Sequence, residues 1–156
     1  MRLVSRRAVG YRKEVAPDSS HHARIELSPL LGWLFGSRPR ALAISDAGLV
    51  VERRRGTTVV PWTEIESMTG GITDVVARDS GAATHTSAAY ELQLRGGEKI
   101  SFGARNAASV VAPFAEAIVQ RAGLEWVDLV VGGRRLPSVA VSPQAAHRLR
   151  ANLSGR

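Results

Sequence analysis

The feature that most constrains this chain is a series of short apolar segments, spaced about ten residues apart between residues 41 and 102. Gly, Asp and Ser residues separate the segments, as at 45–48 and 95–98. In the last pair, 90–94 and 99–102, apolar and polar residues alternate strictly about the sequence Arg-Gly-Gly-Glu. Such alternation is typical of half-buried strands, and a Gly-rich turn between them indicates a β-hairpin. The middle of the chain is therefore predicted to form consecutive antiparallel hairpins.

Other strands are predicted before and after this hairpin, each short, apolar and bounded by turn residues. They span 23–27, 41–44, 49–54, 57–60, 72–76 and 125–131. We expect Gly70-Gly71, like the pairs Gly96-Gly97 and Gly132-Gly133, to form a turn. Residues 77–88 are small and polar, which predicts a loop.

The period of the apolar residues changes after the hairpin. Between residues 106 and 122 they recur at the spacing of an amphipathic helix. Asn106 suits the N-cap, and Gly123 suits the position after the last turn. Proline costs about 3 kcal/mol inside a helix, so Pro113 predicts a start near Ala112 or a bend there. The apolar residues expected to cover the sheet are Val110, Val111, Phe114, Ile118 and Val119.

The length of 156 residues predicts one domain with short additions at its ends. We expect residues 1–20 to be a basic N-terminal arm and residues 21–123 to be the main domain. Residues 124–156 are expected to form a C-terminal extension that packs on this domain or trails from it. Within the extension, Ser142-Pro143 provides the N-cap and the first helical position of a short final helix.

The composition and motifs exclude most chemistry. Without cysteine, the chain has no disulfide, thiolate metal site or cysteine nucleophile. It has no Walker-type phosphate loop and no G-x-G-x-x-G motif after a strand. The histidines, which have no companions at metal-ligand spacing, are His21, His22, His85 and His147. We therefore predict a protein that is not an enzyme and that takes no metal, cofactor or small-molecule substrate.

The order of hairpins followed by one helix leads to a family resemblance. The sequence LAISDAGLVVERRRGTTVVPWTEIESM contains a D-x-G-L and W-x-x-I pattern, formed by Asp46, Gly48, Leu49, Trp62 and Ile65. This pattern resembles bacterial pleckstrin-homology-like (PH-like) domains. The resemblance implies an α+β, mainly β fold: a bent antiparallel sheet or open barrel of about seven strands, capped by one C-terminal amphipathic helix. A short extra strand and helix would follow, and the resemblance implies binding rather than catalysis.

Residues 28–40 carry large apolar side chains beside two arginines. The candidate interface residues are Leu30, Leu31, Trp33, Leu34, Phe35, Arg38 and Arg40. Full burial of each large apolar side chain contributes about 1.5–3 kcal/mol of favourable free energy, so these residues need a surface to pack against. One interpretation is a lid that folds back on the sheet. The other is an exposed loop that enters a membrane interface or a groove on another protein.

Basic residues give the chain a formal net charge of +7, and all but two of its 21 Lys and Arg residues are Arg. Arg53, Arg54 and Arg55 stand together at a predicted hairpin tip and are the candidate anion-binding residues. Arg can bind phosphate through two parallel hydrogen bonds. A solvated turn is the alternative interpretation. No aromatic residue is interleaved with these arginines, so stacking on nucleic-acid bases is not supported.

Three hypotheses for function follow. The first is a non-catalytic adaptor that docks on another protein, or on a second copy of itself, through sheet edges and residues 28–40. The second is peripheral binding to an anionic membrane through the apolar loop and its arginines. The third is nonspecific nucleic-acid binding through the arginine clusters. We favour the first hypothesis. We expect the protein in the cytoplasm, or at the inner face of the membrane, because no apolar run approaches the roughly 18 residues of a membrane span.

Overall fold

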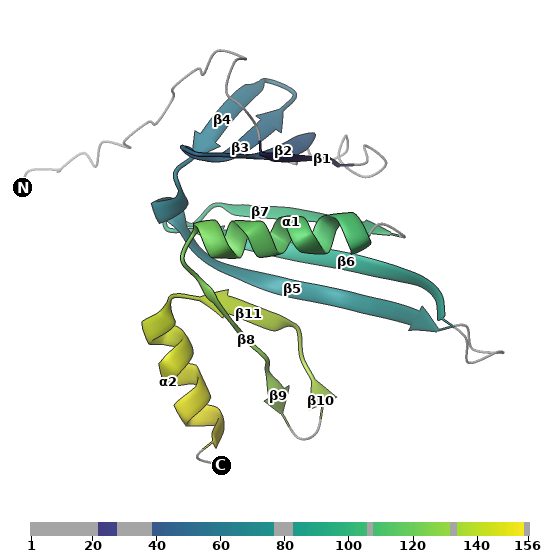
Figure 1. Ribbon diagram of the computed structural model, residues 1–156, viewed down its shortest axis with the longest axis vertical. Coiled ribbons are helices and arrows are strands. Elements are labelled where there is room, and N and C mark those ends of the chain that lie inside the picture. The colour runs from purple at the N-terminus through teal and green to yellow at the C-terminus, as the bar shows by residue number, and fades with distance from the viewer. Residues whose placement is uncertain (1–21, 28–38, 77–82, 106–107, 132–133, 155–156) are drawn as a thin grey trace, which may run out of the picture.

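The predicted hairpins form two antiparallel sheets in the computed structural model (Figure 1). The structure describes residues 22–27, 39–76, 83–105, 108–131 and 134–154. Over these residues the protein is mainly β, with two α-helices and one 3-10 turn, which confirms an α+β chain dominated by strands. The single bent sheet or open barrel is instead divided into sheets of four and five strands, and neither sheet closes on itself.

The first sheet contains four strands in chain order. They are β1 (Ala23–Glu26), β2 (Ala41–Ser45), β3 (Gly48–Arg53) and β4 (Gly56–Val60). In the turn between β2 and β3, the Ser45 hydroxyl donates to the backbone oxygen of Gly48 at 2.8 Å. Gly48 has a φ of +153°, and a Cβ there would lie 2.1 Å from the Val60 oxygen. Only glycine fits between the strands at this point.

A 3-10 turn, η2 (Trp62–Glu64), leads into the second sheet, whose order is β7-β6-β5-β11-β8. Its strands are β5 (Ile65–Val76), β6 (Ala83–Leu94), β7 (Lys99–Arg105), β8 (Glu125–Val127) and β11 (Ser138–Val141). A small ribbon of β9 (Val130–Val131) and β10 (Arg134–Arg135) joins the last two. The predicted hairpin of β6 and β7 is confirmed. The C-terminal extension supplies two strands of this sheet.

Helix α1 (Ala108–Arg121) lies across one face of the second sheet and also contacts β1 (Figure 1). It begins before Pro113 and continues through it, so the predicted start near Ala112 is wrong. Proline has no backbone N–H, so Pro113 cannot donate the helical hydrogen bond to the Ser109 carbonyl. Both Pro113 and Ser109 are exposed, so water can reach that carbonyl.

The second helix, α2 (Pro143–Ser154), packs on β8 and β11. Its start is the predicted one, because the backbone N–H of Ala145 donates to the Ser142 hydroxyl at 3.4 Å as in an N-cap. Ala146 is buried at the contact with the sheet, and so is Val127 of β8. Side chains alternate along a strand, and Trp126 contacts α1 residue Glu116. Helix α2 therefore covers the face opposite to α1.

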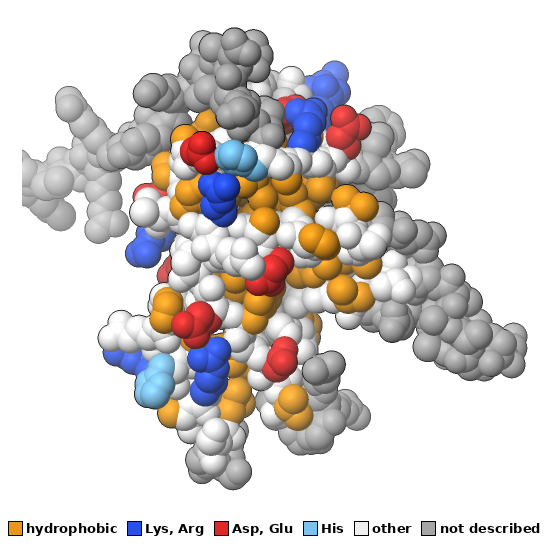
Figure 2. All heavy atoms as spheres, viewed as in Figure 1, with side chains coloured by type: hydrophobic (Ala, Val, Ile, Leu, Met, Phe, Trp, Pro, Cys, Tyr) orange, Lys and Arg blue, Asp and Glu red, His pale blue; other side chains and the backbone are white. Residues whose placement is uncertain are grey.

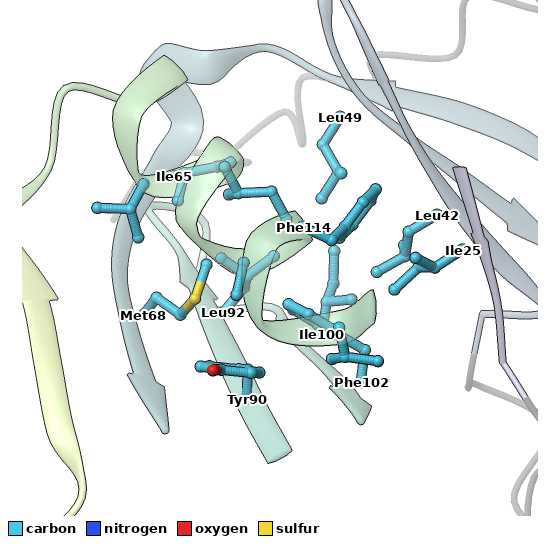
Figure 3. Packing of buried hydrophobic residues seen from close by; sticks show 14 of the residues in the cluster. Ile25, Leu42, Leu49, Ile65, Met68, Tyr90, Leu92, Ile100, Phe102 and Phe114 are labelled. Atoms are coloured by element: carbon cyan, nitrogen blue, oxygen red, sulfur yellow. The ribbon is translucent and has the colours of Figure 1, made fainter. Parts of the chain in front are cut away.

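A single apolar core joins the two sheets and α1 (Figure 3). Phe114 of α1 meets Phe102 of β7 edge to face, with ring centroids 6.1 Å apart. Phe102 in turn stacks on Tyr90 of β6 at 5.5 Å. Leu42 and Leu49 of the first sheet lie on the other side of Phe114. The helix thus supplies the apolar layer between the sheets.

The prediction for Val110 is wrong. This side chain is 57% exposed, whereas Phe114 is 3% exposed. Val111 is buried with Phe114, Ile118 and Val119. These three residues follow Val111 by three, seven and eight positions, which is the spacing of one helix face. Val110 precedes this face by one residue, a rotation of about 100° around the helix. It therefore points to solvent.

One predicted turn and part of one predicted loop are strands in the structure. Gly70 and Gly71 lie inside β5, and the predicted loop at 77–88 ends early because β6 begins at Ala83. Residues 77–82 lie outside the described residues. Glycine marks a close backbone approach here rather than a turn: a Cβ on Gly70 would lie 2.2 Å from the Ala89 oxygen.

Truncating Phe114 tests the central layer. Phe114→Ala is expected to lower the free energy of unfolding by about 3–5 kcal/mol, because it leaves a cavity against Phe102. Val110→Ala, on the same helix, is expected to change it by less than about 0.5 kcal/mol. Urea denaturation followed by circular dichroism measures both. Equal losses in the two variants would contradict this packing.

Gly70 and Gly71 form a second matched pair. Gly70 has a φ of +152° and no room for a Cβ, whereas a Cβ on Gly71 meets nothing within 4 Å. Gly70→Ala is therefore expected to destabilise the protein by about 2–4 kcal/mol, and Gly71→Ala by less than about 1 kcal/mol. Thermal unfolding of the two variants side by side checks the difference. A Gly70→Ala protein as stable as Gly71→Ala would refute the close approach of β5 and β6.

Candidate functional site

A shallow groove crosses β5, β6 and β7 of the second sheet. Tyr90 and Phe102 point to the core, so Glu91 and Ser101, their neighbours along the strands, point to the opposite face. The groove has a volume of about 640 Å³. Its lining draws on residues of both orientations. Those that point away from the core are Thr69, Ser87, Ala89, Glu91, Ser101 and Gly103, and the others in the strands are Gly70, Ala88, Tyr90, Phe102 and Ala104. Leu27, Pro39 and Pro137 complete it.

Small residues form the floor of the groove. Ala89 and Ser101 are exposed, and Gly103 between them has no side chain. A Cβ on Gly103 would lie 2.4 Å from the Ala88 oxygen, so this position requires glycine. Small side chains leave the backbone of the sheet accessible, and they leave room for the side chains of a bound segment.

Strand β7 forms one border of the groove and one edge of the sheet. Within the described residues it pairs only with β6, without a bulge. At the start of this hairpin, the Leu94 N–H donates to the Glu98 oxygen at 2.9 Å. Bonds alternate along an antiparallel ladder, so the backbone groups of Lys99, Ser101 and Gly103 point away from β6. With respect to the rest of the described chain, this edge has unpaired donors and acceptors that an extended segment could meet.

Most of the predicted interface lies outside the described residues. This applies to Leu30, Leu31, Trp33, Leu34, Phe35 and Arg38. Arg40 is described: its side chain is exposed, and its backbone N–H donates to the Glu52 oxygen at 2.6 Å. Leu27 and Pro39, the described residues on either side of 28–38, both line the groove. The sequence prediction and the groove therefore meet at the same place on the chain.

The predicted arginine cluster is divided by the structure. Arg54 and Arg55 form the exposed two-residue loop between β3 and β4. Arg53, at the end of β3, is partly buried and forms an ion pair with Glu98 in the turn between β6 and β7. Among the described residues, Arg54 and Arg55 have no carboxylate partner. Of the three arginines in the cluster, these two are the ones available to bind an anion.

A second, smaller pocket lies on the α1 face of the sheet. It has a volume of about 220 Å³. Its lining residues are Gly70, Gly71, Tyr90, Ala112, Glu116, Trp126, Asp128 and Ser138. They come from β5, β6, α1, β11 and the segment 125–128, and sequence analysis did not single out any of them as functional. No sequence motif connects them, because only the pairing of β11 with β5 and β8 brings them together.

A charged cluster connects β1, the β2–β3 turn and the end of α1. His22 Nε2 lies 2.7 Å from Asp46 Oδ1, and Arg121 donates to the same oxygen at 3.1 Å. Figure 2 shows acidic, histidine and basic side chains together near the top of the face turned to the viewer. All three side chains are exposed, so the cluster ties surface elements together. Asp46 belongs to the pattern that carries the PH-like resemblance.

The described residues contain no group of three or more His, Cys, Asp or Glu side chains placed to hold a metal ion. None of the described helices is both long enough and apolar enough to cross a membrane. Comparison with family models, curated proteins and solved structures finds no match for this chain. Function must therefore be inferred from the geometry of the chain itself.

The charged cluster makes a pH-dependent prediction. Hydrogen bonds from His22 and then Arg121 hold the pKa of Asp46 below its ordinary value of 3.8. NMR titration of the Asp46 carboxyl is expected to give a pKa below 3.8, and His22→Ala is expected to raise it. Because the folded pKa is the lower one, the stabilisation is present above pH 3.8 and is lost as the pH falls through the folded pKa. His147 is an exposed histidine on α2, so His147→Ala serves as the control and should leave the titration of Asp46 unchanged.

Proposed function

We propose that this chain is a non-catalytic, PH-like binding module that docks an extended segment of another protein along β7. The observation that carries this proposal is the unpaired edge of β7 beside an open groove with a floor of small side chains. An extended peptide that adds to a sheet edge gains affinity from main-chain hydrogen bonds, and neighbouring pockets select its side chains.

The course of the chain supports the PH-like assignment. Strands β1 to β7 precede α1, which packs against both sheets. The residues of the resemblance also have structural roles: Gly48 fits closely against Val60, while Leu49 and Ile65 are buried. A fold of this kind supplies a rigid frame, and the binding surface depends on which edges and loops it leaves open.

Among the described strands, β1, β4, β7 and β8 are the edges of the two larger sheets, and β7 is the most suitable. It is seven residues long, compared with four for β1, five for β4 and three for β8. The edge of β5 is covered by β11. A longer edge offers more hydrogen bonds to an added strand, and β7 is the edge whose residues line the groove.

Charge suggests the chemistry of the partner. The net charge of +7 attracts acidic segments over long range, and the attraction weakens as salt is added. Lys99 on the β7 edge is exposed, although it pairs with Glu91 at 2.7 Å. We therefore expect an extended segment with Asp or Glu residues beside small or apolar ones.

The experiment uses Ser101, whose N–H points away from β6. Ser101→Pro removes this donor without removing a bond within the sheet. Peptides are selected from a random phage library on the immobilised protein, synthesised, and titrated by fluorescence anisotropy. They are expected to bind the Ser101→Pro variant at least about tenfold more weakly than the original protein.

Ser101→Ala is the matched control, because it keeps the N–H, and it should change affinity by less than about twofold. Amide NMR spectra should show bound peptide at Ser101 and Gly103. Peptides that bind Ser101→Pro as tightly as the original protein, or no bound peptide at all, would overturn the proposal. A different outcome would favour the membrane hypothesis. In that outcome no peptide binds, and the original protein and the Ser101→Pro variant sediment equally with phosphatidylserine vesicles.

A further inference from the structure

The pocket on the α1 face, which we call the Tyr90 pocket, shares Gly70 and Tyr90 with the lining of the β7 groove but is otherwise formed by different residues. Its walls come from elements that are distant in sequence: Tyr90 of β6, Glu116 of α1, Trp126 of β8 and Ser138 of β11. Gly70 lies at its base, where a Cβ would strike the Tyr90 ring at 2.7 Å. The absence of a side chain there helps to keep the pocket open.

Two carboxylates give the pocket a negative character. Glu116 Oε2 accepts a hydrogen bond from the Trp126 indole at 2.8 Å, and its Oε1 accepts one from Gln120 at 3.3 Å. Asp128 Oδ1 accepts one from the Ser138 hydroxyl at 2.6 Å. All of these donors are neutral, so they orient the carboxylates without cancelling their charge.

The described residues that line the pocket include no Lys or Arg. Arg150 contacts residues beside the pocket, and its guanidinium is already engaged. It donates to Glu125 Oε2 at 3.0 Å and to the backbone oxygen of Trp126 at 3.1 Å. In a chain of net charge +7, this pocket is a local concentration of negative charge without a cation of its own among its described lining residues.

Tyr90 provides a second, independent feature of the pocket. Only 8% of this residue is exposed, and its hydroxyl has no hydrogen-bond partner among the described residues. Figure 3 shows its oxygen on the side of the ring nearer β5, which is where the pocket lies. Burial, followed by the charge of Glu116, raises the pKa of Tyr90 above its ordinary value of 10.0. Trp62 Nε1, and not the Tyr90 hydroxyl, is the buried polar atom without a partner among the described residues, so the Tyr90 hydroxyl is accessible from the pocket. It remains protonated at neutral pH and offers an acceptor oxygen to a ligand.

The aromatic rings add a further attraction for cations. The Tyr90 and Trp126 rings have centroids 6.3 Å apart and are inclined by 52°. Ring faces attract cations, and Trp and Tyr are the side chains best suited to this. Two aromatic rings, two carboxylates and a free hydroxyl around a small space form the kind of environment that recognises an ammonium group.

We infer that the Tyr90 pocket binds a primary ammonium group, carried by a lysine side chain of a partner or by a free alkylamine. The carboxylates of Glu116 and Asp128 would balance the charge, the Tyr90 oxygen would accept one ammonium proton, and the Trp126 ring would contact the methylene carbons. This inference does not depend on peptide binding at β7.

The test titrates the full chain with butylammonium, with N-acetyl-lysine methylamide and with 1-butanol, a neutral molecule of similar length. Amide and indole NMR signals report binding, and the indole N–H of Trp126 and the amides of Gly70 and Gly71 should shift and saturate with the two amines only. Tighter binding of the lysine derivative would identify a peptide lysine as the source. Equal binding would show that a free amine suffices. Both outcomes support the inference.

Variants separate charge recognition from general folding. Glu116→Gln and Asp128→Asn should each weaken amine binding by about two- to fivefold. Tyr90→Phe, which removes only the hydroxyl, should also weaken it. Glu125→Gln is the control, because Glu125 is a neighbouring carboxylate that does not line the pocket, and it should leave amine binding unchanged. Butanol binding as tight as amine binding, or no saturable shift with either amine, would overturn the inference. Because Trp126 lines this pocket alone and Ser101 lines the groove alone, failure here is distinguishable from failure of the β7 proposal.

Discussion

The packing of α1 between the two sheets is the contact on which the rest of the structure depends. Phe114 meets Phe102, and Phe102 stacks on Tyr90, so one line of rings connects the helix to the middle of the second sheet. Tyr90 and Phe102, two rings of this line, also line the groove beside β7. The same helix presents Glu116 on its exposed side, where Trp126 of β8 donates to it. Core packing therefore determines where the Tyr90 pocket lies, and it fixes two of the residues that line the groove.

The C-terminal extension decides which surfaces remain open. Strand β11 pairs with β5 and covers an edge that would otherwise be free, while β8 extends the sheet and places Trp126 near Tyr90. Helix α2 covers the outer face of β8 and β11, where Val127 and Ala146 are buried. Pro137, just before β11, also lines the groove. The segment after α1 thus supplies residues to both candidate sites.

Local patterns predicted the elements well where one physical rule applied. The alternation about Arg-Gly-Gly-Glu specified the hairpin of β6 and β7, and Ser142-Pro143 specified the start of α2. Prediction was wrong where glycine had two possible uses. Gly70-Gly71 looked like a turn but lies inside β5, and the small residues after Ala83 looked like a loop but form a strand. The Tyr90 pocket could not be predicted, because its lining depends on the pairing of β11 with β5, which is a long-range contact without a sequence signature.

One glycine links the two candidate sites. Gly70 lines both the groove and the Tyr90 pocket, since it lies in the middle of β5 and has no side chain on either face. A Cβ at this position would lie 2.2 Å from the Ala89 oxygen and 2.7 Å from the Tyr90 ring. Its φ of +152° also favours glycine over other residues. Close contact between β5 and β6 therefore requires glycine at this position. The contact between β5 and β6 at Gly70 holds the Tyr90 ring against β5. A side chain at this position would therefore change the shape of both the groove and the Tyr90 pocket.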